Sequence, residues 1–110
     1  MKENRSGPGE ETREFFSGFI RLHVLYHAGR GEIFGLGIIE ELRRHGYELS
    51  PGTLYPILHG MEERGYLSSR SRVEKGKVRR LYRITPRGRK ILRKSEMKIR
   101  ELFQELLKER

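Results

Sequence analysis

The amino-acid sequence predicts a mainly α-helical chain with one small β-hairpin. Three observations support this fold class. Apolar residues recur at helical spacing in three stretches before residue 64, two runs of alternating side chains flank a short polar loop at 74–77, and helical spacing returns from residue 86 almost to the end. With 110 residues, the chain is expected to form one domain with a modest core, which a second subunit could extend.

The first expected helix begins at Thr12, a residue type that caps helices, and ends at Gly29. Gly18 weakens its first turns, so the start could lie nearer Ser17. The apolar residues of this helix occupy more than one stripe, which predicts packing against a second surface besides the core. Residues 1–11 contain Gly, Pro, Asn and Ser and are predicted to form a disordered leader.

The second expected helix covers the stretch from residue 35 to Gly46, where glycine can take the left-handed conformation that ends a helix. The residues that it turns inward are Ile38, Ile39 and Leu42. The segment before it, residues 29–34, is expected to be a turn.

The third expected helix lies in the stretch LSPGTLYPILHGMEERGYL, residues 49–67, and is expected to end at Gly65, a second glycine suited to the left-handed conformation. Its inward side chains, spaced i, i+3, i+4 and i+7, are Leu54, Ile57, Leu58 and Met61. Ser50 suits the cap position and Pro51 the first helical position. Pro56 removes a backbone donor in the second turn, so regular helical bonding is expected only from Thr53 onward. Such a helix start would expose backbone donors at the positive pole of the helix, where a phosphate can bind.

The two alternating runs predict a hairpin with a four-residue loop at 74–77. The register we expect pairs Val73 with Val78, Ser69 with Tyr82, and Leu67 with Ile84. One face of the hairpin would then be buried through Leu67, Tyr82 and Ile84. The opposite face would carry four arginines, Arg70, Arg72, Arg79 and Arg83.

The last expected helix follows Thr85 as cap and Pro86 at the first position, and runs to about Lys108. A helix of about 22 residues spans about 33 Å, which is longer than so small a core needs. The element order is therefore helix, helix, tight turn, helix, hairpin, helix. This is the order of a winged helix-turn-helix, in which the third helix enters the major groove of DNA and the hairpin, or wing, lies over the backbone or minor groove.

The positive charge of the chain is concentrated in one block. The net charge is +9, but residues 64–100 alone hold 15 Lys and Arg against two acids, or +13, which leaves −4 for the rest. A one-sided basic block favours a polyanion, above all nucleic acid. The residues of the third helix and wing that we predict to bind double-stranded DNA are Ser50, Thr53, Tyr55, His59, Arg70, Arg72, Lys75, Lys77, Arg79 and Arg83.

Two stretches, LSPGTLYPILHGMEERGYLSS at 49–69 and KVRRLYRITPRGRKIL at 77–92, resemble the PadR family of bacterial and archaeal transcriptional regulators. The likeness covers roughly residues 18–107 and is closest to the short subfamily with one C-terminal helix. One departure is visible: where the family commonly has His-Gly-Tyr at the start of the second helix, this chain has Phe-Gly-Leu at 34–36.

The resemblance implies a homodimer, usually a repressor, bound to a two-fold-related operator. Residues 12–84 would be the winged-helix DNA-binding domain and 85–110 a dimerisation helix that packs against the first helix of the partner. The residues assigned to this interface are Phe15, Phe19, Leu92, Ile99, Leu102, Phe103 and Leu106. Family members are typically released from DNA by small effectors at the dimer interface. Some relatives use a tryptophan there and this chain has none, so its response to an effector is left open.

Several other functions are disfavoured. The chain has no cysteine, which excludes disulfides and thiolate chemistry and fits a reducing cytoplasm. It shows no apolar run long enough to span a bilayer and no arrangement of catalytic residues, so neither a membrane protein nor an enzyme is expected. His23 and His27 stand at i, i+4, but no third ligand is apparent in the sequence, so we predict no metal site and no cofactor.

Two alternatives to a sequence-specific regulator stay open. In the first, the winged helix is a protein-interaction module whose basic block meets an acidic partner. In the second, it is an architectural DNA-binding protein, with a steep salt dependence but little preference among sequences.

Overall fold

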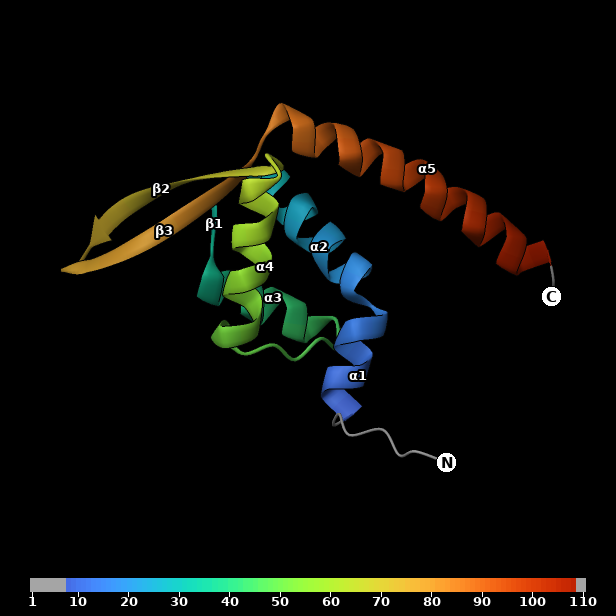
Figure 1. The fold of residues 1–110 in the computed structure, drawn as a ribbon, viewed down its shortest axis with the longest axis horizontal. Helices are drawn as coiled ribbons and strands as arrows, with labels where there is room; N and C mark the ends of the chain where they lie inside the picture. Colours follow the sequence, from blue (N-terminus) through green and yellow to red (C-terminus); the bar gives the residue numbers. More distant parts are fainter. Residues whose placement is uncertain (1–7, 109–110) are drawn as a thin grey trace.

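A computed structural model describes residues 8–108 of the chain. The predicted fold class is confirmed: the described residues are mostly helical, with a three-stranded antiparallel sheet in the order β1-β3-β2 (Figure 1). In chain order the elements are α1 (Pro8–Phe15), α2 (Ser17–Arg30), β1 (Ile33–Phe34), α3 (Gly35–Arg44), α4 (Pro51–Glu63), β2 (Leu67–Glu74), β3 (Lys77–Ile84) and α5 (Pro86–Lys108).

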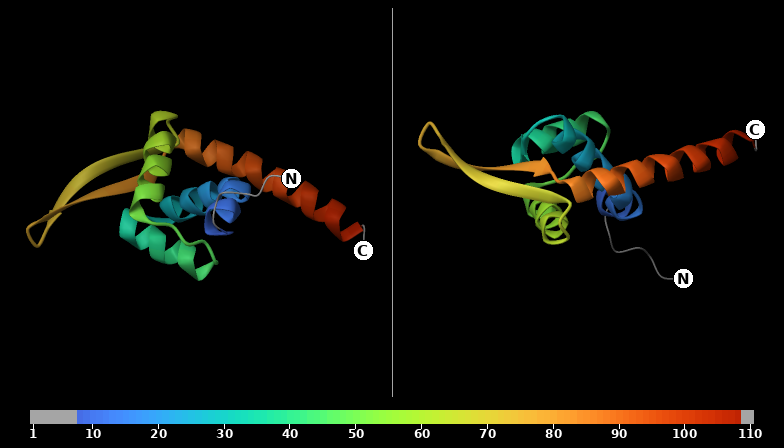
Figure 2. Two further views of the ribbon diagram at one scale, coloured as in Figure 1. Left: turned by 60° about the horizontal axis from the view of Figure 1, so that its bottom comes forward. Right: turned by 90° about the horizontal axis from the view of Figure 1, so that it is seen from above.

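Helices α2, α3 and α4 form the body of the protein, and two elements project from it. The β2–β3 hairpin extends from one side and α5 from the other, as all three ribbon views show (Figures 1 and 2). In the described part of the chain no helix is long and apolar enough to cross a membrane. The hairpin and α5 are the two parts of the fold whose side chains are most free to contact other molecules.

The first helix differs from its prediction. The sequence predicts one helix from Thr12, whereas the chain forms α1 from Pro8 and then leaves helical geometry at Phe16, with φ −100° and ψ 21°. The helix that packs on the core begins at Ser17, the later start that Gly18 suggests. Of the expected leader, residues 1–7 lie outside the described residues, and the remainder belongs to α1.

The segment expected to be a turn at 29–34 contains a short strand, β1, which the sequence does not predict. Ile33 pairs with Tyr82 and Phe34 with Leu81. A strand of two residues is too short to show alternation, and only its pairing with β3 defines it. β1 therefore joins the start of α3 to the wing.

The predicted hairpin register is confirmed at Leu67–Ile84, Ser69–Tyr82 and Val73–Val78. The loop is shorter than the expected four residues, because Glu74 also pairs with Lys77. The two residues left, Lys75 and Gly76, both have positive φ, 51° and 79°. This is the geometry of a type I′ turn, which follows the twist of the two strands.

The core is a single cluster of buried apolar side chains from α2, α3, α4 and the inner end of the hairpin. Of the four inward residues predicted for α4, Leu54, Leu58 and Met61 are buried, and Ile57 is half-buried at the edge of the cluster. Gly46 and Gly65 end α3 and α4 with φ of 88° and 83°, as their positions predict.

Tyr82 is the largest fully buried side chain, and its hydroxyl has no hydrogen-bond partner among the described residues. Burial, followed by the charge of Glu62, raises the pKa of this hydroxyl. Removing an unpaired buried hydroxyl costs no hydrogen bond, so we expect Tyr82→Phe to leave the free energy of unfolding unchanged or to raise it by up to about 1 kcal/mol. Urea unfolding measures this. A clear loss of stability would show that the hydroxyl has a partner such as a bound water.

A compact junction joins the end of α4, the base of the wing and the start of α5. The Thr85 hydroxyl accepts a hydrogen bond from the Gly88 amide at 3.0 Å and donates one to the Gly65 carbonyl. A Cβ atom at position 88 would overlap the Tyr66 carbonyl oxygen and lie 2.8 Å from Ile84 Cγ1. The Thr85-x-x-Gly88 spacing is therefore required by the junction: the threonine caps α5, and the glycine lets α5 approach the backbone of residue 66.

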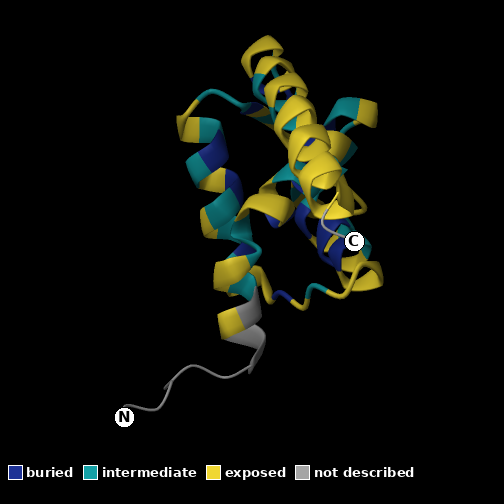
Figure 3. Cartoon of the chain, turned by 90° about the vertical axis from the view of Figure 1, so that its right-hand side faces the viewer, coloured by how far each residue is buried: buried dark blue, intermediate teal, exposed yellow. Residues whose placement is uncertain are grey.

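Helix α5 packs on the body only near its start. Ile91 and Leu92 are half-buried against the core, whereas the helix beyond residue 95 is exposed on all sides in the isolated chain (Figure 3). The 23-residue helix thus carries exposed leucines and phenylalanine along its second half.

Candidate nucleic-acid interface

The N-terminal end of α4 supplies polar groups to the candidate DNA-binding face. Ser50 occupies the N-cap position in an extended conformation, but its hydroxyl caps no backbone amide and lies 3.3 Å from the Thr53 hydroxyl. The amides of Thr53 and Leu54 both donate to the Ser50 carbonyl at 3.0 Å, so the first helical bonds begin at Thr53 as expected. Both hydroxyls thus lie at the N-terminal end of α4, where the helix dipole is positive. This end of the helix therefore favours contact with an anion.

Tyr55 is held in place by packing. It is half-buried, and its hydroxyl end lies so close to Gly35 that a Cβ atom there would overlap the ring. The glycine of the Phe-Gly-Leu stretch at 34–36 therefore makes room for Tyr55. His59, one turn further along α4, is exposed, with its ring centroid 6.4 Å from that of Tyr55.

A hollow of about 220 Å³ separates Tyr55 from the wing. Its wall on the wing side is formed by Lys77, Val78, Arg79 and Arg80 of β3. The outer face of α4 and the basic strand thus border one continuous depression.

Four of the predicted DNA-binding arginines are paired with acids. Arg70 makes a two-pronged ion pair with Glu32, with nitrogen–oxygen distances of 2.6 and 2.7 Å, and Arg83 lies 3.8 Å from the same carboxylate. The hydrogen bond from Arg70 lowers the pKa of Glu32. Arg72 and Arg79 flank Glu74 at 3.6 and 3.5 Å, and Arg79 also lies over the Phe34 ring at 4.5 Å.

The two lysines at the tip of the wing form no ion pair among the described residues. Lys75 and Lys77 are exposed and pair with no acidic side chain in the part of the chain that the structure describes. Over residues 70–83 there are seven Lys and Arg, and counting Glu32 and Glu74 against them leaves a net charge of +5. The sequence did not point to Glu32, which is 38 residues from Arg70 and comes close only because β1 pairs with β3.

The residues assigned to a dimer interface lie on α1, α2 and α5. Leu92 is half-buried against the core. The others are exposed in the isolated chain, from 44% for Phe19 and Ile99 to 81% for Phe15: Phe15, Phe19, Ile99, Leu102, Phe103 and Leu106. Met97, Leu107 and Tyr26 are similarly exposed.

The structure also corrects one expectation about the histidines. The sequence offers no third ligand beside His23 and His27, but the end of α3 brings His45 to them, with ligand nitrogens of all three within 4.8 Å of one another. This cluster lies apart from the α4 and wing face, and its chemistry is taken up below.

Comparison with known proteins assigns the chain to a family. Residues 24–94 match the family described as "Transcriptional regulator PadR-like family". The transcriptional regulator Rv3488 of Mycobacterium tuberculosis is 48% identical over 95 residues, which cover 86% of this chain and 89% of that protein.

Solved structures are similar as well. A PadR family regulator from Eggerthella lenta has a TM-score of 0.77 at 28% identity, covering 90% of this chain and 88% of that one. A transcriptional regulator from Clostridium thermocellum has a TM-score of 0.72 at 27% identity, covering 87% and 96%. The family match extends from α2 into α5, and so includes the α4 face, the wing and the Thr85–Gly88 junction. The chain belongs to the PadR-like family of transcriptional regulators.

Proposed function

We propose that this chain is a homodimeric, sequence-specific DNA-binding repressor. The observation that carries the proposal is the outer face of α4, with the Ser50 and Thr53 hydroxyls at its start, beside a wing whose net charge is +5 when Glu32 is counted, in a chain of a transcriptional regulator family. In this proposal α4 enters the major groove, where Tyr55 and His59 reach base edges. Ser50 and Thr53 contact a phosphate at the helix start.

The wing cations are proposed to divide into two groups. Arg70 and Arg83 pair with Glu32 at the base of the wing, and Arg72 and Arg79 both pair with Glu74. These ion pairs partly neutralise the four arginines, so they contribute less to DNA binding than free cations would. Lys75 and Lys77 at the tip would contact phosphates directly. Phosphate contacts add affinity on every sequence and carry no sequence preference of their own.

Replacing both tip lysines, Lys75→Gln and Lys77→Gln, should weaken binding about equally on all duplexes. Because each phosphate contact contributes about 0.9 to the salt slope, the slope of log K against log salt should fall by about 2. Fluorescence anisotropy over a salt series measures it. The matched control is Lys94→Gln with Lys98→Gln on α5, which removes the same charge away from the wing. A loss confined to one sequence would contradict the phosphate role.

The dimer is proposed to form through α5 and the first helices of the partner, which would bury the exposed apolar side chains of α5. Two copies of α4 would then read two-fold-related half-sites about 10 base pairs apart or a multiple of that. Release by a small effector also remains a proposal. It is supported by the groove of about 550 Å³ between α2, α3 and α5, which Phe19, Leu92 and Ile99 help to line.

The test of DNA recognition compares the duplex upstream of the chain's own gene with a scrambled duplex, at two salt concentrations. A preference of about a thousandfold at physiological salt is expected of a specific regulator. His59→Ala removes a proposed base contact and should reduce that preference, whereas Glu63→Ala, at the far end of α4, should not. Equal, salt-sensitive binding to both duplexes would favour an architectural protein, and no binding at low salt would favour a protein-interaction module.

A further inference from the structure

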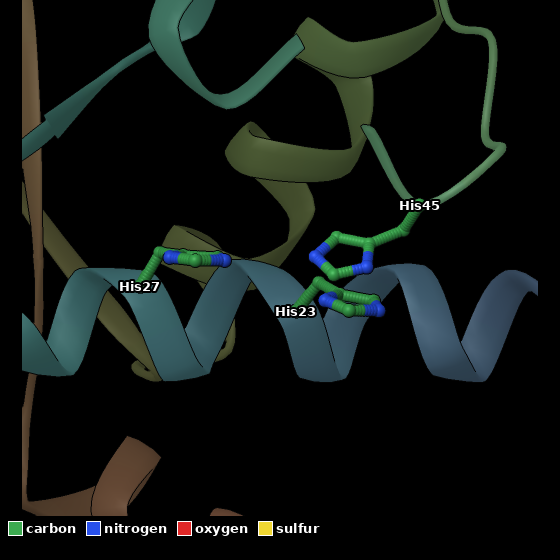
Figure 4. Close-up of side chains that lie close together, drawn as sticks. All are labelled: His23, His27 and His45. Carbon is green, nitrogen blue, oxygen red and sulfur yellow. The ribbon is translucent and has the colours of Figure 1, made fainter. Parts of the chain in front are cut away.

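Three histidines gather on the side of the body that faces α5 (Figure 4). His23 and His27 are one turn apart on α2, and His45 directly follows the last residue of α3. The His23 and His45 rings are stacked with centroids 4.4 Å apart, and the His27 ring is nearly parallel to that of His23. Ligand nitrogens of all three lie within 4.8 Å of one another.

A carboxylate stands beside the three rings. Oε2 of Glu41 is 3.8 Å from Nε2 of His27. Glu41 is one turn before His45, just as His23 is one turn before His27, so α2 contributes two side chains at i, i+4, and α3 with the residue that follows it contributes two more. Arg44 also touches Glu41, at 3.3 Å, but this is a contact at the surface that can be exchanged for water.

We propose that His23, His27 and His45, with Glu41 as the fourth ligand, bind one divalent transition-metal ion of the zinc type. Imidazole nitrogens suit Zn²⁺ and its neighbours, whereas Mg²⁺ and Ca²⁺ take oxygen ligands. Tetrahedral zinc with bonds of about 2.0–2.1 Å places its ligand nitrogens about 3.4 Å apart. Each pair of histidine nitrogens therefore has to close by up to about 1.4 Å, and the Glu41 carboxylate has to turn toward them, movements that rotation of the four side chains can supply.

The surroundings of the cluster include two acidic side chains. The groups that face the cluster are Glu41 on α3 and Glu96 on α5, which lines the same groove. Both carboxylates favour a cation there.

The proposed metal site lies between the helix proposed to bind DNA, α4, and the helix proposed to form the dimer, α5. A bound ion would fasten α2, on which α5 packs, to α3, against which α4 packs. It would thereby fix α4 relative to α5, and a metal ion would be an effector bound in the groove described above. This consequence rests on the proposed DNA-binding function, whereas the metal site does not.

The test is a calorimetric titration of the metal-free full-length chain with Zn²⁺ near pH 7, without DNA. One ion per chain is expected, and His45→Ala should weaken binding by at least about a hundredfold, because it removes one of the proposed ligands. His59→Ala removes an exposed histidine of α4 and should keep the wild-type affinity. Co²⁺ gives a second readout: the visible absorption of a tetrahedral complex should appear in the wild type and the His59→Ala variant and be absent from His45→Ala.

His45 is at an exposed helix end, so its replacement should leave the fold intact, and far-UV circular dichroism verifies this. Failure of the wild type to bind Zn²⁺, or binding that His45→Ala leaves unchanged, would overturn the proposal. An equal loss in His59→Ala would also overturn it. Intact zinc binding in a protein that binds no DNA would count against the proposed function and leave the metal site standing.

Discussion

Replacing Ile99 and Leu102 with glutamate is expected to produce monomers and to lower operator affinity by at least about a hundredfold. Both side chains are exposed in the isolated chain, at 44% and 49%, on the part of α5 beyond its contact with the core. Burying each in a dimer would contribute about 1.5–3 kcal/mol, and a buried unpaired carboxylate reverses that gain. A monomer also loses the effective-concentration advantage of a second half-site, which is about 10² to 10⁴.

Sedimentation velocity measures the oligomeric state, and anisotropy on the operator duplex measures the affinity. Gln104→Glu is the control, because it adds a negative charge to α5 away from the apolar stripe. Dimers that persist in the Ile99→Glu, Leu102→Glu variant would refute the proposed α5 seam. Monomers that bind the operator as tightly as the wild type would refute the link between dimerisation and affinity.

The largest expected effect on folding comes from Gly88→Ala. An added methyl group would overlap the Tyr66 carbonyl oxygen, a backbone atom that cannot rotate away, so α5 has to shift off the base of the wing. Overpacking against backbone should lower the free energy of unfolding by about 3 kcal/mol, or the melting temperature by roughly 10–20 °C for a domain of this size.

Gly18→Ala is the matched control, since it makes the same chemical change in α2 where nothing lies within 4 Å of the new methyl group. Alanine is the better helix former, so this variant should be up to about 1 kcal/mol more stable than the wild type. Thermal unfolding of the two variants side by side tests the argument. Equal melting temperatures for Gly88→Ala and the wild type would mean that the junction is looser than it looks.

Much of the fold could be predicted because its signals are local. The hairpin register followed from alternation in both strands, which brought Leu67 opposite Ile84. The ends of α3 and α4 followed from Gly46 and Gly65, where positive φ is required. Strand β1 could not be predicted, since its two residues carry no period, and the break at Phe16 has no sequence signal of the kind that Pro provides.

The site was less predictable, because its electrostatics depend on residues far apart in the chain. Sequence alone presents Arg70 as a free cation, and only the pairing of β1 with β3 brings Glu32 to it. His45 joins His23 for the same reason: the crossing of α2 and α3, not any spacing in the sequence, places them together. The roles in DNA binding assigned to α4 and the wing stay predictions for the experiments above.

The Thr85 junction has a consequence for the operator. One hydroxyl links the end of α4, through the Gly65 carbonyl, to the first turn of α5, through the Gly88 amide. If α5 forms the dimer, no flexible linker separates α4 from the dimer interface in either subunit. The distance between the two copies of α4 is then fixed. DNA binding would then depend on the spacing between the two half-sites as well as on their sequence. Inserting half a helical turn between the half-sites should abolish cooperative binding even when every contacted base is kept.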